Sequence, residues 1–222
     1  MDQVRAAFRD ECARLEQVLR DLDEADLDRP TPCPPWTVRD LLAHVRTGAG
    51  RLAGMLAAPA PERVEVDAAG YFGAAKFAPE VDRDRIDGAR REARELPAVP
   101  EVAEGFARAW RAADAAVAAA PPGRLVRTRH GDAMALTEFL RTRVVEVAVH
   151  GLDLADALDR RPWLTPTAAT VVAGLLSDGA TPEGLGWDAL TLVRKATGRV
   201  PLTDAERGVL DRTGFRWLSF GG

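Results

Sequence analysis

Apolar residues recur at three- and four-residue steps in four long stretches of the chain, the spacing that places them on one face of a helix. The four stretches cover residues 2–22, 37–56, 99–119 and 137–158. Prolines crowd residues 26–35 and stop the first helix, because proline lacks a backbone donor. Thr37 is expected to cap the second helix, with Asp40 as the acid of a capping box.

The rest of the chain shows weaker patterns. Residues 57–97 have no regular period, and since a structureless loop of that length is uncommon in a compact domain, we expect short helices there and a segment that covers a site. Residues 125–128 are expected to be briefly extended. Shorter helical patterns follow at residues 165–177, 187–197 and 203–212.

These elements predict an all-α protein built on an antiparallel four-helix bundle, a fold in which metal sites commonly form between facing helices. We expect the bundle to occupy residues 1–160. Residues 161–222 are expected to form a small, mainly helical C-terminal extension that packs on it.

Composition and charge narrow the function. The chain has 222 residues, a formal net charge of −4 and no basic stripe, so we expect no nucleic-acid binding. No apolar run approaches the roughly 18 to 20 residues that span a bilayer. The first residues form a charged amphipathic pattern rather than a signal peptide, so we expect no membrane partner and a cytoplasmic location.

The two cysteines, Cys12 and Cys33, are too few for a disulfide framework and are not spaced as a metal knuckle. Cys12 falls on the apolar stripe of the first helix and is expected to fill the core. Cys33 belongs to the proline-rich turn.

Glu146 and His150 are one helical turn apart, so their side chains point to the same side of the fourth helix. They border its apolar line, where an ionised glutamate needs a partner. Two interpretations remain open. Either Glu146 pairs with Arg143 or Arg39 and His150 donates to a carbonyl, or the two side chains bind a cation together.

His44 favours the cation, because it lies at the edge of the apolar stripe of the second helix and can face the fourth. Two imidazoles and a carboxylate leave an open position on zinc, as in catalytic sites. His44, Glu146 and His150 are therefore candidate ligands of one shared metal site, and the interpretation as ordinary side-chain pairs stays open beside it. Asp153, one turn further, either orients a ligand through a hydrogen bond or pairs with an arginine. His130 is interpreted as a loop histidine.

Two segments resemble motifs of the mycothiol-dependent maleylpyruvate isomerase family, in the DinB-like superfamily: TPCPPWTVRDLLAHV at residues 31–45 and EVAVHGLDL at residues 146–154. The resemblance covers roughly residues 1–160. It implies a DinB-like bundle with a divalent metal, usually taken as zinc, on His44, Glu146 and His150. Pro35 stands where the family more often has glycine, and the chain beyond residue 162 matches less clearly.

The resemblance implies a metal-dependent thiol transferase or isomerase with mycothiol as cosubstrate. A thiol bound to a divalent ion is deprotonated, and the thiolate attacks a small electrophile. No catalytic residue is expected beyond the metal ligands, and neither cysteine is needed as nucleophile. The competing hypothesis is a non-catalytic bundle that binds a small molecule or partner, with a structural or lost metal site.

Some residues keep two interpretations. Trp36 either walls the pocket or packs the entrance of the second helix. Arg207, Arg212 and Arg216 either bind a carboxylate of the substrate or thiol, or lie on solvated helix faces.

Overall fold

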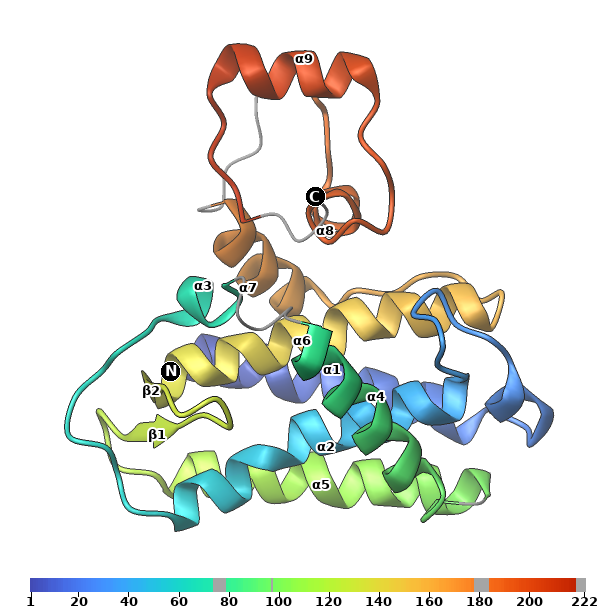
Figure 1. Cartoon of the computed structure of the whole chain (residues 1–222), viewed down its shortest axis with the longest axis vertical. Helices are drawn as coiled ribbons and strands as arrows, with labels where there is room; N and C mark the ends of the chain where they lie inside the picture. Colours follow the sequence, from blue (N-terminus) through green and yellow to red (C-terminus); the bar gives the residue numbers. More distant parts are fainter. Residues whose placement is uncertain (74–78, 97, 178–183, 219–222) are drawn as a thin grey trace.

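The computed structural model describes residues 1–73, 79–96, 98–177 and 184–218. Four long helices form its core (Figure 1), and they agree with the four predicted helices to within two residues at each end. These helices are α1 (Asp2–Arg20), α2 (Val38–Ala57), α5 (Val99–Ala119) and α6 (Leu136–Ala157). The expected all-α four-helix bundle is confirmed.

Helices α1 and α2 each pack against both α5 and α6. Arg5, near the start of α1, pairs with Asp114, near the end of α5, so these two helices are antiparallel. Helices α2 and α6 are antiparallel too, because Gly48 of α2 lies beside Arg143, whereas His44, one turn earlier, lies beside Glu146. The predicted antiparallel packing therefore holds for these pairs.

Helices α2 and α5, in contrast, run in the same direction. Arg46 of α2 lies against Gly105, and Gly50 lies against Ala109, so the contacts advance together along both helices. Parallel neighbours cannot be joined by a tight turn, so the chain between them must return along the bundle in a long crossover.

The crossover carries helices α3 (Ala68–Tyr71) and α4 (Pro79–Ala93), which agree with the helices expected between residues 57 and 97. Helix α4 packs on α2. A short 3-10 helix, η1 (Ala25–Asp28), precedes the proline-rich turn. Strands β1 (Leu125–Arg127) and β2 (Ala133–Ala135) form an antiparallel hairpin before α6. The extended pattern predicted the first strand, and the second was not predicted.

Helix α6 is buried on nearly all sides, because α1, α2, α3 and α7 (Pro166–Ser177) all pack on it. The sequence predicted one apolar line, yet 16 of its 22 residues are buried. Several of the buried residues are polar, including Thr142, Arg143 and Asp153, and each therefore needs a partner inside the protein.

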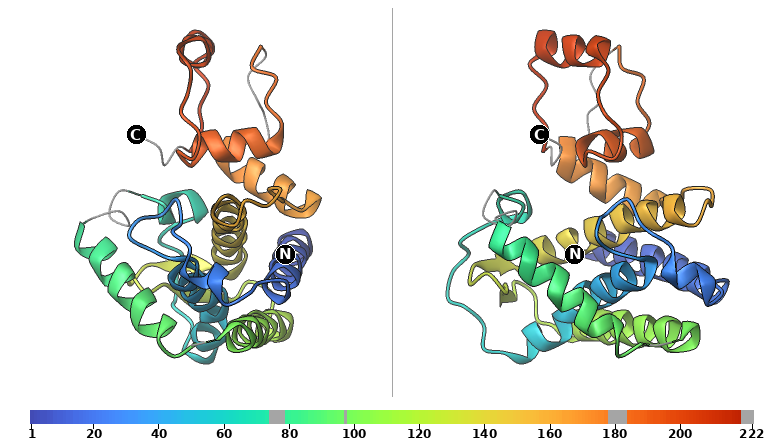
Figure 2. Two further views of the ribbon diagram at one scale, coloured as in Figure 1. Left: turned by 90° about the vertical axis from the view of Figure 1, so that its right-hand side faces the viewer. Right: turned by 45° about the vertical axis from the view of Figure 1, so that its right-hand side comes forward.

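The C-terminal part continues with α8 (Ala189–Ala196) and α9 (Asp204–Thr213), close to the helices predicted there. Helix α7 packs on α1 and α6, and its buried side chains join the main core. Trp187, Leu192 and Leu210 form a second, smaller core further out. Figure 2 shows α9 at the end of this part that lies farthest from the bundle. The division at residue 160 stays a prediction.

No helix among the described residues combines the length and the apolar character that crossing a membrane requires.

The close contact between α2 and α5 gives a test with a matched control. A Cβ at position 50 would lie 3.0 Å from the Cβ of Ala109, which cannot rotate away, whereas a Cβ at position 54 would meet nothing within 4 Å. Gly54→Ala should raise the free energy of unfolding by about 1 kcal/mol through helix propensity. Gly50→Ala should lower it, because the two helices must separate. Urea unfolding measures both, and an equal gain at the two positions would contradict the packing described here.

Candidate metal centre

The start of α2 is fixed by the predicted capping box. The hydroxyl of Thr37 accepts a hydrogen bond from the backbone N–H of Asp40, and the Asp40 carboxylate accepts one from the N–H of Thr37, at 3.1 Å. This cap sets His44 about two turns into the helix, on the side that faces α6. Trp36, directly before the cap, is buried with its ring 4.8 Å from that of His44.

The structure brings His44, Glu146 and His150 together. The Nε2 atom of His44 lies 3.3 Å from Oε2 of Glu146, and Nε2 of His150 lies 3.7 Å from the same oxygen. All three ligand atoms lie within 4.8 Å of one another. Tetrahedral zinc with bonds of about 2.0 to 2.2 Å separates its ligand atoms by roughly 3.4 Å. The spacing therefore suits a divalent ion.

Hydrogen bonding of His150 supports the same fit. Its Nδ1 lies 2.9 Å from the Asp153 carboxylate, which only accepts, so Nδ1 carries the proton. In the neutral ring Nε2 then has a free lone pair, and it faces the acceptor oxygen of Glu146. Two acceptors at this distance need a positive charge between them. Either a proton on Nε2 or a cation bound between the two atoms can supply that charge.

His44 is in the protonation state that a metal requires. Burial lowers its pKa to about 4, and the hydrogen bond with Glu146 only partly opposes this effect. The imidazole of His44 is therefore neutral at pH 7, and neutral imidazole is the form that binds metals.

Asp153 is fully buried and has three partners. Besides His150, Arg199 donates to both of its oxygens, at 3.0 and 2.8 Å, and the thiol of Cys33 donates to it at 3.2 Å. Burial alone would raise the pKa of this carboxyl, but the bonds from His150 and Arg199 outweigh burial and hold it well below its usual range. The hydrogen bond with His150 and the pairing with an arginine, both considered from the sequence, are present together.

Arg199 was not among the predicted site residues. It lies just beyond the end of α8, where Gly198 adopts a left-handed conformation with φ 74°. The N–H of Arg199 then returns to the carbonyl of Arg194, at 2.8 Å, which turns the arginine side chain toward α6. Gly198 could have been recognised from the sequence as the end of α8. Nothing in the sequence pattern, however, indicated that Arg199 would contact Asp153.

Cys33 lies beside the centre as a protonated thiol. Burial and then the charge of Asp153 raise the pKa of Cys33 to about 12. Cys33, His150 and Asp153 also lie close enough to hold an ion, but Arg199 and His150 already bond the Asp153 oxygens. Cys12 is fully buried in the core, as expected.

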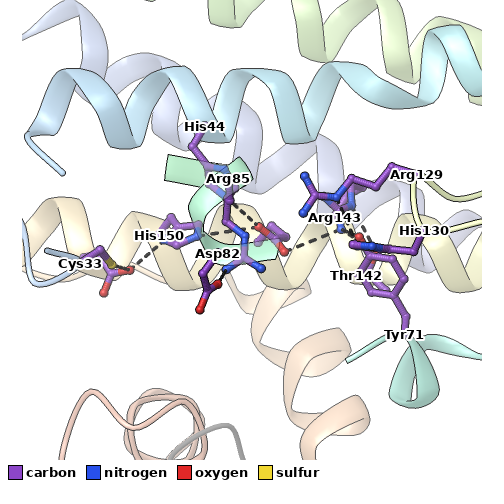
Figure 3. A network of polar contacts seen from close by, with 12 residues as sticks. Cys33, His44, Tyr71, Asp82, Arg85, Arg129, His130, Thr142, Arg143 and His150 are labelled. Atoms are coloured by element: carbon purple, nitrogen blue, oxygen red, sulfur yellow. Dashed lines mark hydrogen bonds and ion pairs between the residues drawn. The ribbon is translucent and has the colours of Figure 1, made fainter. Parts of the chain in front are cut away.

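The second oxygen of Glu146 lies 3.7 Å from Nη2 of Arg143, one of the two arginines considered from the sequence. The other, Arg39, donates to the carbonyl of Leu96 at 2.9 Å. Figure 3 shows the polar contacts continuing from Cys33 through His150 toward Arg143. His130 lies apart from the candidate ligands, in the turn between β1 and β2.

A cavity of about 340 Å³ lies over the three candidate ligands. Its walls come from the proline-rich turn, α2, α4, α6 and the chain after α8. The lining residues are Cys33, Pro34, Trp36, His44, Phe72, Asp82, Arg85, Ile86, Val145, Glu146, Val149, His150, Thr197 and Arg199. Trp36 thus both packs the helix entrance and walls the cavity, and the crossover covers the site as expected. Arg207, Arg212 and Arg216 do not line it.

Comparison with known proteins gives one family and two structures. The family described as the mycothiol maleylpyruvate isomerase N-terminal domain matches residues 8–155. A crystal structure of the mycothiol-dependent maleylpyruvate isomerase is 17% identical, with a TM-score of 0.54 over 80% of this chain and 70% of that chain. A histidine-to-alanine mutant of it is 16% identical, with a TM-score of 0.55 over the same shares. No curated protein matches. At these identities the two structures show a shared fold.

Two arginine–aspartate pairs, one from within α8 and one from just beyond its end, test the effect of burial on Asp153. Arg199→Met leaves a fully buried carboxylate short of its charged partner and should lower the free energy of unfolding by about 3 kcal/mol. Arg194 also donates two hydrogen bonds to a carboxylate, that of Asp156, one turn along α6. This aspartate is exposed. Arg194→Met should cost less than about 1 kcal/mol. Guanidinium unfolding compares the two, and equal losses would contradict the role of burial.

Proposed function

Because the chain belongs to the family of the mycothiol maleylpyruvate isomerase N-terminal domain, we propose that it is a metal-dependent enzyme that uses mycothiol on a small electrophilic substrate. The observation that carries the proposal is the half-buried trio of ligand atoms at the floor of a cavity large enough for a small molecule. His44, Glu146 and His150 hold the ion, which is zinc, and leave a position open to the thiol.

A bound divalent ion would favour the deprotonated form of a coordinated thiol at neutral pH. The residues around it do the rest. Asp153 holds His150 in the tautomer that presents Nε2 to the ion, and Arg199 holds Asp153 in turn. Trp36 and the apolar side chains of the cavity wall limit the access of water to the thiolate.

The reaction is addition of the thiolate to an electrophilic carbon of the substrate. In an isomerase the new C–S bond turns a neighbouring double bond into a single bond, rotation follows, and expulsion of the thiolate restores the double bond in the other configuration. In a transferase the thiol stays on the product. Both similar crystal structures are of an isomerase, which favours the isomerase reaction. With its pKa at about 12, Cys33 stays protonated and serves as a hydrogen-bond donor, which leaves the nucleophile to mycothiol.

Metal analysis of the purified chain tests the first step. The wild type should retain close to one zinc or comparable divalent ion per chain, and His44→Ala should lose it, because two ligands of this type rarely hold zinc alone. His130→Ala is the matched control and should keep the ion, since His130 lies in the β1–β2 turn. A wild type without metal would favour the competing hypothesis, a non-catalytic bundle.

Thiol chemistry tests the second step. Metal-loaded protein should convert conjugated electrophiles in the presence of mycothiol, to an isomer seen by absorbance or to a thiol adduct seen by mass spectrometry. Cys33→Ala should keep most of this activity, because the thiol of Cys33 is not the nucleophile. Complete loss of turnover in a folded, metal-loaded Cys33→Ala protein would overturn that assignment, and no reaction with any thiol would overturn the proposed activity.

A further inference from the structure

A second, smaller cavity of about 120 Å³ lies beside the first and shares His44, Arg85 and Glu146 with it. Three further arginines converge on it from different elements: Arg51 from α2, Arg129 from the turn between β1 and β2, and Arg143 from α6. A ligand that occupies this cavity therefore reaches the candidate metal centre directly.

Of the four arginines that line this cavity, Arg85 pairs with Asp82 at 2.7 Å, whereas Arg51 and Arg129 have no close counter-charge in the described part of the chain. Arg143 is buried, donates to Tyr71 and Thr142, and lies 3.7 Å from Glu146. Nε of Arg129 donates a hydrogen bond to Nε2 of His130, at 3.2 Å. Within the described residues, no carboxylate lies within ion-pair distance of Arg51 or Arg129.

Holding these guanidinium groups together is unfavourable without an anion. Burial lowers the pKa of Arg51, and the charges of Arg129 and Arg143 lower it further. An arrangement of this kind costs folding free energy and is typical of a binding site that an anionic ligand completes. The guanidinium group pairs with a carboxylate through two parallel hydrogen bonds, which fixes the orientation of the ligand.

We propose that this arginine pocket, formed by Arg51, Arg129 and Arg143, binds a carboxylate group of the electrophilic substrate and so places its reactive carbon over the metal centre. The identity of the ligand as the substrate rests on the proposed function, whereas anion binding by the pocket does not require the metal. The substrate class is a small electrophile with a carboxylate a few bonds from the reacting carbon.

A carboxylate suits the pocket because its planar group matches the two parallel donors of a guanidinium group, and the guanidinium groups of Arg51, Arg129 and Arg143 come from three elements. The lining also includes the acidic residues Asp84, Glu92 and Glu146, and Arg85 is already paired with Asp82 at 2.7 Å. The positive charge left without a close partner is that of Arg51 and Arg129. A small dicarboxylate spreads two negative charges over two groups, whereas phosphate carries its charge on one.

Malonate, an unreactive small dicarboxylate, is the probe, with inorganic phosphate for comparison. The full-length chain is titrated by calorimetry, both as purified and after chelator treatment, because a bound metal can itself take a carboxylate. Malonate should bind both forms of the wild type more tightly than phosphate. Arg51→Gln should weaken malonate binding at least about tenfold, as expected for the loss of a charge-assisted hydrogen bond. Arg108→Gln, on an exposed face of α5, removes the same charge and should change nothing.

Two further measurements keep the result independent of folding. Without anion, Arg51→Gln should be at least as stable to urea as the wild type, because it removes a charge that the fold holds unfavourably. Gly88→Leu fills the cavity without changing charge, since a Cβ at Gly88 meets nothing within 4 Å, and it should also weaken malonate binding at least about tenfold.

Equal malonate affinity in Arg51→Gln and the wild type would overturn the proposal, as would tighter binding of phosphate or no binding of malonate. The two proposals fail separately. A chain that binds malonate but no metal would refute the proposed function and leave the pocket in place. A chain that binds metal and reacts with mycothiol but ignores malonate would refute the pocket alone.

Discussion

Helix α6 leaves almost no face to water, and the arrangement of the site follows from that constraint. A polar side chain on a buried helix costs free energy unless another part of the protein pairs with it. Thr142, Arg143, Glu146, His150 and Asp153 all lie on α6 and touch one another or a neighbouring element. The result is one continuous polar chain through an otherwise apolar core. Its weakest junction is the pair of acceptors on Glu146 and His150, and a cation between them would make the chain fully satisfied.

The partners of this polar chain come from segments far apart in the sequence. Helix α2 brings His44, the crossover brings Tyr71, and the turn after α8 brings Arg199. The parallel course of α2 and α5 forces the crossover to return along the bundle, and this return lays α4 across the cavity. Topology and chemistry are therefore linked, because the same long connection that the helix directions require also provides the cover of the site.

The sequence predicted the bundle well, because helix period, capping at Thr37 and proline breaks are local signals. It also predicted that His44, Glu146 and His150 could meet, since helix spacing limits where such side chains point. Their role as metal ligands stays a prediction. Arg199 and Arg129 escaped prediction, because their positions depend on how the turn after α8 and the hairpin before α6 pack on the bundle. Helix α6 also proved buried all round, since α3 and α7 cover faces that its own periodicity did not assign to the core.

The origin of the cavity walls has a consequence for how such a protein diversifies. The three candidate ligands stand on α2 and α6, in the rigid core, whereas Asp82, Arg85 and Ile86 come from the crossover and Thr197 from the C-terminal part. Substitutions in these outer segments change the shape and charge that a substrate meets and leave the ligand spacing intact. A candidate metal centre can thus be inherited unchanged while the range of molecules that fit the cavity shifts, because the two properties are encoded in separate stretches of the gene.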